Sequence, residues 1–153
     1  GKDWQQEGCA AYLQMVSRLR TAGEMAKQEG ITIGIRTGMG AKFDKKLLKK
    51  VGSSQIKVYY NFQDAADHHR DICKELRKLG AQRIVQIHAS NTDSVNLQED
   101  PEINLPKIRK TLDKMKWSGW LVVERSRDVK RVRDVKYNFG RNIAYLKQVF
   151  QER

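Results

Sequence analysis

The stretch SGWLVVERSRD, residues 118–128, decides the fold of this chain. A short apolar run, Trp120–Val123, ends abruptly in the polar residues ERSR at positions 124–127. Strands that read as continuous apolar runs are usually buried on both faces, as in parallel sheets. Polar residues directly after such a strand lie at the carboxyl edge of the sheet, where α/β proteins place their ligand sites. The stretch therefore predicts a buried parallel strand with a candidate site at its end.

Three earlier stretches have the same shape. They are ITIGIR at Ile31–Arg36, IKVYYN at Ile56–Asn61 and IVQIH at Ile84–His88. Side chains alternate between the two faces of a strand, so each polar end shares a face with the residue two positions earlier. The four ends and their partners are Arg36 with Gly34, Asn61 with Tyr59, His88 with Gln86, and Glu124 with Val122. We expect these ends to converge on one rim.

Segments with helical periodicity alternate with these strands. We expect helices at residues 5–28, 41–51, 66–79, 106–116 and 138–150, with Asp64 as a plausible N-cap of the third, and long loops at 89–105 and 125–137. The order is one helix followed by four βα units, which predicts a parallel sheet with right-handed crossovers. It fits an open doubly wound sheet or half of an eight-stranded barrel. No G-x-G-x-x-G follows the first strand, and functional residues at several strand ends are typical of a barrel.

Length and charge bound the possibilities. The chain has 153 residues, enough for one domain, and a net charge of +12. That charge suggests nucleic acid or acidic lipid as partners. The lysines are spread over successive helices without interleaved aromatic residues, however, which favours a solvated surface over a base-stacking platform. No run is long enough to span a membrane. We expect a soluble protein, cytoplasmic or, if a signal was removed, periplasmic.

Several stretches resemble a known family. IGIRTG, VYYNFQDA, IVQIHASNTD, SGWLVVERSRD and YNFGRNIAYLKQVF are similar to the C-terminal half of the sugar phosphate isomerase/epimerase proteins, the xylose isomerase-like TIM barrels. The resemblance runs from about Gly30 to the end, so we treat residues 1–153 as one domain. It implies a half barrel of about four βα units whose other half is absent here. We expect the chain to self-associate and so complete the barrel.

The resemblance also implies a chemistry. In such barrels a divalent cation, commonly Mn²⁺, Mg²⁺, Co²⁺ or Zn²⁺, is held by Glu, Asp, His and Glu at successive strand ends. The two glutamates move a proton to and from the carbon beside a carbonyl. By position, these residues correspond to Arg36, Asn61, His88 and Glu124. Asn61, His88 and Glu124 are therefore the candidate metal ligands, and Glu124 is the candidate catalytic residue.

The chain departs from the family pattern at several positions. Arg36 replaces a carboxylate by a guanidinium, which cannot act as a base. Asn61 offers an amide oxygen but no charge for a hard cation. The Lys and Asp that usually follow the histidine are replaced by Ser90 and Asn91. Arg36 either pairs with Glu124 or binds a phosphate or carboxylate bidentately. The candidate substrate contacts are Arg36, Asn91, Arg125 and Arg127.

Three functions remain open. The first is metal-assisted proton transfer on a sugar or sugar phosphate, in a site depleted of metal ligands. The second is a barrel that binds a sugar or an anion without catalysis, with Arg36 in place of the cation. The third is nucleic-acid binding, since a DNA-repair endonuclease family shares this barrel type. The chain has only three histidines, few for the three-metal cluster of that family, which makes nucleic acid the weakest of the three.

Overall fold

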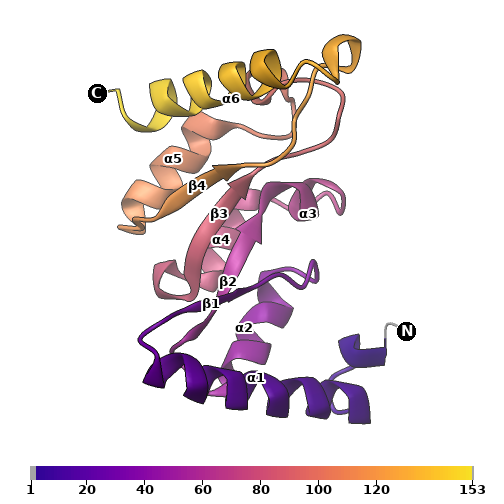
Figure 1. Cartoon of the computed structure of the whole chain (residues 1–153), viewed down its shortest axis with the longest axis vertical. Helices are drawn as coiled ribbons and strands as arrows, with labels where there is room; N and C mark the ends of the chain where they lie inside the picture. The colour runs from indigo at the N-terminus through magenta and orange to yellow at the C-terminus, as the bar shows by residue number, and fades with distance from the viewer. Residues whose placement is uncertain (1–2, 153) are drawn as a thin grey trace.

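A four-stranded parallel sheet forms the centre of the chain in the computed structural model, which describes residues 3–152. The strands are β1 (Ile33–Ile35), β2 (Ile56–Asn61), β3 (Ile84–Ala89) and β4 (Trp120–Val123). They pair in chain order, β1-β2-β3-β4 (Figure 1). This arrangement confirms the predicted half barrel of four βα units after an opening helix.

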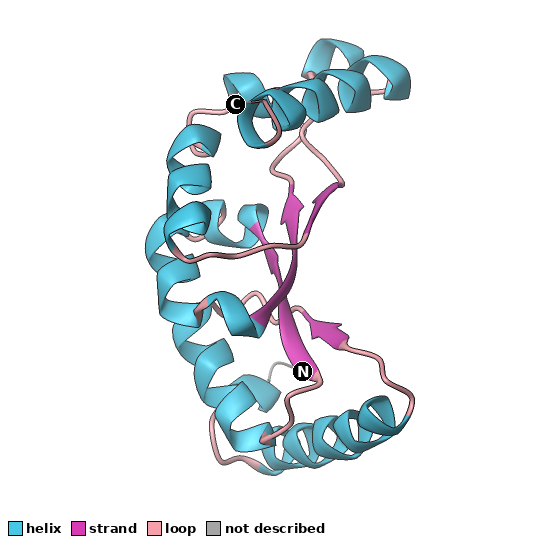
Figure 2. Cartoon of the chain, turned by 90° about the vertical axis from the view of Figure 1, so that its left-hand side faces the viewer, coloured by secondary structure: helices cyan, strands magenta, loops and turns pink. Residues whose placement is uncertain are grey.

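The helices follow one another as a curved row beside the sheet. They are α1 (Ala10–Gln28), α2 (Ala41–Val51), α3 (Phe62–Ala66), α4 (Ile72–Leu79), α5 (Leu105–Lys114) and α6 (Val135–Phe150). Short 3-10 turns lie at Asp3–Gln5, Ala81–Arg83, Leu97–Glu99 and Val129–Arg131. The row covers one face of the sheet, while the opposite face stays open (Figure 2). The open face corresponds to the lumen of a whole barrel.

The hydrophobic core lies between the sheet and the helices. Ile56, Val58 and Tyr60 of β2 are buried on the helical side, and Ile87 and Ala89 of β3 join them. Alternate residues of the same strands face the open side because side chains change face at each residue. One irregularity, between Val58 and Tyr59, shifts the pairing of β2 with β3. The period-2 pattern therefore places the polar strand ends on the open face.

Two element boundaries differ from the sequence prediction. The helix expected at 66–79 begins only at Ile72, as α4, while Ala66 ends the separate short helix α3. In the turn between the two helices, His69 has a φ of 50°. The predicted N-cap Asp64 lies inside α3, so that prediction was wrong. Asn61 caps α3 by accepting from the Gln63 N–H, and Asp71 caps α4 by accepting from the Lys74 N–H. Capping carboxylates and amides satisfy helix N–H groups that have no partner within the helix.

Other limits differ from the prediction as well. The strand expected at Ile31–Arg36 is β1 at Ile33–Ile35, and α5 ends at Lys114 rather than at 116. The first helix begins at Ala10 rather than near residue 5, and the last begins at Val135 rather than at 138. None of the helices in residues 3–152 is both long and apolar enough to cross a membrane.

Candidate functional site

Three of the four predicted strand ends meet at the carboxyl edge of the sheet. The register aligns Asn61 with His88, and His88 with Val122, so that Glu124 follows β4 beside them. His88 Nδ1 lies 3.1 Å from Glu124 Oε2, and Asn61 Nδ2 lies 3.2 Å from the same oxygen. The Glu124 side chain is 42% exposed and that of His88 is 15% exposed. Glu124 is thus oriented by two neighbours and still open to a ligand.

The orientation of the Asn61 amide follows from its role as a helix cap. Its Oδ1 accepts from the backbone N–H of Gln63 at 2.8 Å and from Ser90 Oγ at 3.0 Å. A backbone N–H only donates, so the amide oxygen must face Gln63. The amide nitrogen then points to Glu124. An aspartate at this position can also cap the helix, but it cannot donate to the glutamate.

His88 is held from two further sides. Its Nε2 lies 3.0 Å from Gln86 Nε2, two residues earlier on the same strand. The Tyr59 ring stacks on the imidazole with ring centroids 4.3 Å apart and an interplanar angle of 29°. Gln86 and Tyr59 are the residues that share a face with His88 and Asn61 in the sequence pattern, which shows why a period-2 pattern located this cluster.

Arg36 does not pair with Glu124. Its guanidinium binds Asp64 of α3 bidentately, with Nε at 2.7 Å and Nη2 at 2.6 Å from the two carboxylate oxygens. This hydrogen-bonded pairing with Asp64 raises the pKa of Arg36 above its ordinary value, and a hydrogen bond with Tyr59 adds to the effect. Of the two alternatives for Arg36, the pair with Glu124 is therefore wrong. Two of the guanidinium nitrogens are engaged by Asp64, whose carboxylate compensates the positive charge.

The rim does not fit a divalent cation. Within residues 3–152 there is no group of three or more His, Cys, Asp or Glu side chains placed to hold a metal. The oxygen of Asn61 already accepts two hydrogen bonds, and its nitrogen faces the carboxylate that a cation would need. Only His88 and Glu124 remain as donors, fewer than the three or four protein ligands of a zinc site. The residues present therefore do not match the cation site that the family resemblance implies.

The other predicted substrate contacts are engaged inside the protein. Arg125 and Arg127 both bind Asp93, at 2.5 Å and 2.7 Å. The two guanidinium groups hold the pKa of the Asp93 carboxyl well below its ordinary value. Asn91 is buried, and its amide donates to Asp100 at 2.7 Å. The structure thus places these three in the loops around the rim, and their contact with a substrate stays a prediction.

A buried charged cluster lies behind the rim, between β2 and the helices α2 and α4. Asp44 is 5% exposed and accepts from Thr37 Oγ1 at 2.5 Å. Burial raises the pKa of Asp44 to about 6, while the hydrogen bond from Thr37 opposes the rise. Glu75 also raises this pKa and Arg70 lowers it. These groups hold the Gly-rich turn at 37–40, since Glu75 accepts from the Ala41 N–H and Arg70 donates to the Gly38 carbonyl.

The loop after β4 depends on residues that the sequence analysis did not single out. Ser126 is fully buried with a φ of 97°, and its carbonyl accepts from the amides of Asn96 and Asn142. Asn138 donates to the backbone carbonyls of Arg131 and Asp134. The spacing of Asn138 and Asn142, four residues apart on a helix, was the available signal, because such residues share a helix face. Buried amides of this kind need partners, and the loop supplies them.

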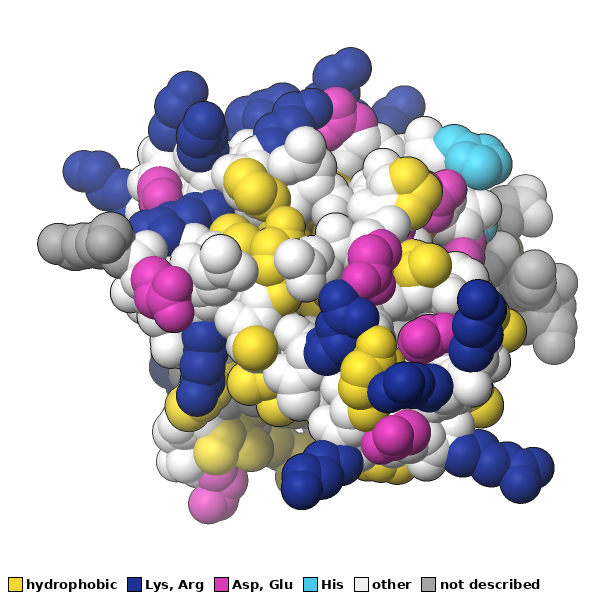
Figure 3. Space-filling view, turned by 90° about the horizontal axis from the view of Figure 1, so that it is seen from above, with side chains coloured by type: hydrophobic (Ala, Val, Ile, Leu, Met, Phe, Trp, Pro, Cys, Tyr) yellow, Lys and Arg dark blue, Asp and Glu magenta, His cyan; other side chains and the backbone are white. Residues whose placement is uncertain are grey.

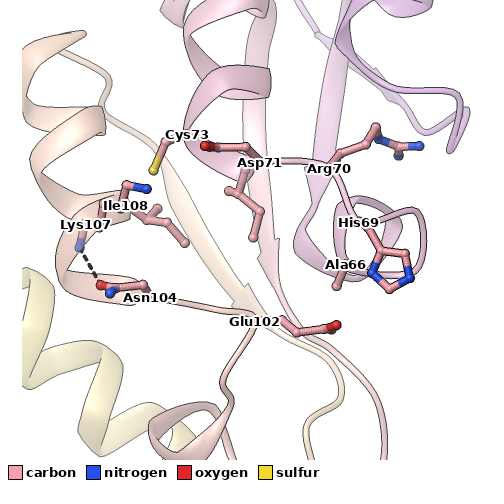
Figure 4. A pocket seen from close by; sticks show the side chains of 10 residues that line it. Ala66, His69, Arg70, Asp71, Cys73, Glu102, Asn104, Lys107 and Ile108 are labelled. Carbon is pink, nitrogen blue, oxygen red and sulfur yellow. Dashed lines mark hydrogen bonds between the residues drawn. The ribbon is translucent and has the colours of Figure 1, made fainter.

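A separate cavity of about 360 Å³ lies between the starts of α4 and α5. Figure 4 shows Arg70 and Asp71 on one side of it and Asn104 and Lys107 on the other. Asp71 and Asn104 are the N-caps of their helices, bonded to the N–H groups of Lys74 and Lys107. No strand-end residue of the predicted rim lines this cavity. Helix capping thus accounts for two of its polar side chains, those of Asp71 and Asn104.

Comparison with known proteins supports the fold. Solved structures similar to this chain include a D-psicose 3-epimerase crystallised in the presence of D-fructose (TM-score 0.75, 14% identity, 91% of this chain and 56% of that chain). A xylose isomerase domain protein from Planctomyces limnophilus gives a TM-score of 0.75 at 13% identity over 94% of this chain and 57% of that one. An AP endonuclease of family 2 from Brucella melitensis gives 0.66 at 16% identity, over 86% and 56%.

These likenesses concern the fold. The chain spans little more than half the length of the solved structures it matches. No curated protein matches it. The family model described as xylose isomerase-like TIM barrel matches residues 1–149. With its four parallel βα units and its row of polar strand ends, the chain belongs to the xylose isomerase-like TIM barrel family.

Proposed function

We propose that this chain acts on a sugar or sugar phosphate at the rim, with Glu124 transferring a proton to and from the carbon beside a carbonyl. The observation that carries the proposal is the Glu124 carboxylate, held by His88 at 3.1 Å and Asn61 at 3.2 Å yet 42% exposed. A general base must be both fixed and reachable, and this carboxylate is both. The epimerases among the similar structures favour a sugar as the substrate class.

The proposed step needs no cation. The C–H bond beside the carbonyl breaks, and its proton passes to the Glu124 carboxylate. The electron pair of that bond forms the C=C bond of an enediolate, while the π pair of the carbonyl moves to its oxygen. Glu124 then exchanges its proton with solvent, so that return to the same carbon leaves solvent hydrogen there. Return to the neighbouring carbon, with passage of that carbon's hydroxyl proton to the former carbonyl oxygen, moves the carbonyl. The donors on Glu124 hold the carboxylate in place. Arg36, in the position where the family resemblance implies a glutamate, is paired with Asp64 and is given no part in this step.

Solvent deuterium exchange tests the proposal. The protein is incubated in D₂O with a panel of ketoses and ketose phosphates, with and without EDTA, and ¹H NMR follows the proton beside the carbonyl. We expect exchange that EDTA leaves unchanged and that Glu124→Gln lowers by about 100-fold or more, the usual contribution of a general base. Glu24→Gln, at an exposed position of α1, is the matched control and should exchange like the wild type. Exchange that needs added divalent cation, or that survives Glu124→Gln, contradicts the proposal.

A second candidate is a barrel that binds a sugar or an anion without turning it over. The composition of the rim favours it. Arg36 and Asn61 stand where the family resemblance implies a glutamate and an aspartate, so that Glu124 is the one remaining member of the two glutamates that transfer the proton. Calorimetric titration of the same ketoses and of inorganic phosphate separates the two candidates. Binding without any deuterium exchange supports the second candidate over the first.

A further inference from the structure

Gln86 has a position that the proposed function does not yet use. Gln86 and His88 lie on the same face of β3, and the register places Gln86 between Tyr59 of β2 and Trp120 of β4. The Gln86 side-chain nitrogen lies 3.0 Å from His88 Nε2, while His88 Nδ1 lies 3.1 Å from Glu124 Oε2. The two ring nitrogens thus have different kinds of partner.

These partners determine where the imidazole carries its proton. An ionised carboxylate only accepts hydrogen bonds, so the nitrogen that faces Glu124 must bear the hydrogen. In a neutral imidazole the other nitrogen is then an acceptor, and an amide NH₂ is the donor it requires. Gln86 presents such a nitrogen to Nε2. The hydrogen bonds therefore all run the same way: Gln86 donates to His88 Nε2, and His88 Nδ1–H donates to Glu124.

The ring has little freedom to change this arrangement. The Tyr59 ring covers one face of the imidazole at a centroid distance of 4.3 Å, and the His88 side chain is 15% exposed. A change of tautomer would place a bare Nδ1 against the Glu124 carboxylate, and a flip of the ring would place carbon atoms where the two ring nitrogens now meet their partners. Both alternatives leave partly buried polar groups unpaired, which is costly.

We propose that Gln86 is a positioning residue that locks His88 in the Nδ1–H tautomer. In this tautomer His88, which the family resemblance assigns as a metal ligand, instead donates a hydrogen bond to Glu124. Nδ1 then has no lone pair to offer a cation, and the lone pair of Nε2 is already engaged by Gln86. That this serves catalysis rests on the proposed function of Glu124, whereas the tautomer itself does not depend on it.

Nitrogen NMR of the histidine rings tests the proposal. Two-bond ¹H–¹⁵N spectra of the ¹⁵N-labelled protein are recorded at about pH 8.5, above the ordinary titration range of histidine. For His88 we expect a protonated Nδ1 and a bare Nε2, assigned by loss of the signals in His88→Gln. In Gln86→Leu we expect the ratio of Nδ1–H to Nε2–H forms to fall by about fivefold, equivalent to roughly 1 kcal/mol for one hydrogen bond.

Controls separate this inference from the proposed function. Gln82→Leu changes an exposed glutamine and should leave the His88 pattern unchanged, and the ring of the exposed His69 serves as an internal reference. A bare Nδ1 in the wild type, or a Gln86→Leu spectrum identical to the wild type, overturns the inference. If the tautomer is found but deuterium exchange is absent, the proposed function fails and the lock stands. If exchange is found with the other tautomer, the lock fails and the proposed function stands.

Discussion

At the scale of single residues, two substitutions set the character of the rim. Asn61 donates to Glu124, where an aspartate would repel it. Arg36 turns to Asp64 instead of Glu124. In each case the side chain donates a hydrogen bond to a carboxylate of the protein, which the carboxylate of the family pattern could not do. The resemblance therefore identifies where the rim lies, while the chemistry of the rim depends on these individual side chains.

The buried carboxyl of Asp44 predicts a pH dependence of stability. Its pKa is raised to about 6 in the folded chain, so the folded state binds this proton more tightly than the unfolded state. Stability contributed by the protonated form is present at low pH and is lost as the pH rises through the folded value. Asp44→Asn keeps an acceptor for Thr37 but cannot ionise.

We therefore expect the variant to gain on the wild type as the pH rises. The free energy of unfolding of Asp44→Asn minus that of the wild type should increase by up to about 3 kcal/mol between about pH 4 and about pH 7. Urea unfolding at a series of pH values measures this difference, and taking a difference cancels the other titrating groups. A difference that stays constant across the range, or one that decreases, contradicts the assignment.

At the scale of elements, α1 is placed by the close approach of Gly23 to the turn before β2. A Cβ at position 23 would lie 2.6 Å from Ser53 Cβ and 3.2 Å from Ile56 Cγ1. The shorter of these contacts does not occur between real carbon atoms, so one of the elements would have to move. Glycine is unfavourable in a helix interior by itself, and this approach is the physical reason for it here.

Two glycine substitutions separate packing from helix propensity. Gly23→Ala should destabilise the chain by about 1–3 kcal/mol, because overpacking outweighs the gain in propensity. Gly140→Ala in α6 is the matched control, since a Cβ there meets nothing within 4 Å. It should stabilise by about 0.5–1 kcal/mol. Thermal and urea unfolding measure both, and a Gly23→Ala variant as stable as Gly140→Ala would show that α1 is not held at this contact.

At the scale of the whole molecule, the sheet has an unpaired strand edge at each end. In the part of the chain that the structure describes, β1 and β4 each pair on one side only. Beside β4 lies an apolar groove of about 460 Å³ lined by side chains that include Trp117, Leu121 and Phe150. Trp120 of the same strand is 79% exposed and the rest of β4 is only partly buried, so the prediction of a buried strand at Trp120–Val123 was wrong. Unpaired strand edges with apolar surroundings are sites of association.

We expect this chain in isolation to self-associate through these edges. Light scattering after size exclusion should give a dimer, and Trp120→Lys should raise its dissociation constant at least about tenfold, because a charge would be buried in the contact. Val129→Lys is the control, as Val129 is 65% exposed in the turn after β4 and outside that groove. A monodisperse monomer at micromolar concentration contradicts this expectation.

The distribution of the positive charge over the surface is also a property of the whole molecule. On the face seen in Figure 3, several Lys and Arg side chains gather along the upper edge, and others stand singly among acidic and apolar side chains. Nucleic-acid binding usually needs a continuous basic patch or stripe. This face thus carries basic side chains at more than one place, with acidic side chains among them, rather than as a single stripe.

The sequence by itself determined the parallel βα order, the strands Ile56–Asn61 and Trp120–Val123, and the meeting of Asn61, His88 and Glu124. These follow from local periodicity and from the rule that parallel strands end at one edge. Only the tertiary structure decided the partners: Asp64 for Arg36, Asp93 for Arg125 and Arg127, and Gln86 for His88. Hydrogen bonds and ion pairs depend on ångström distances between segments far apart in the chain. No periodicity encodes those distances.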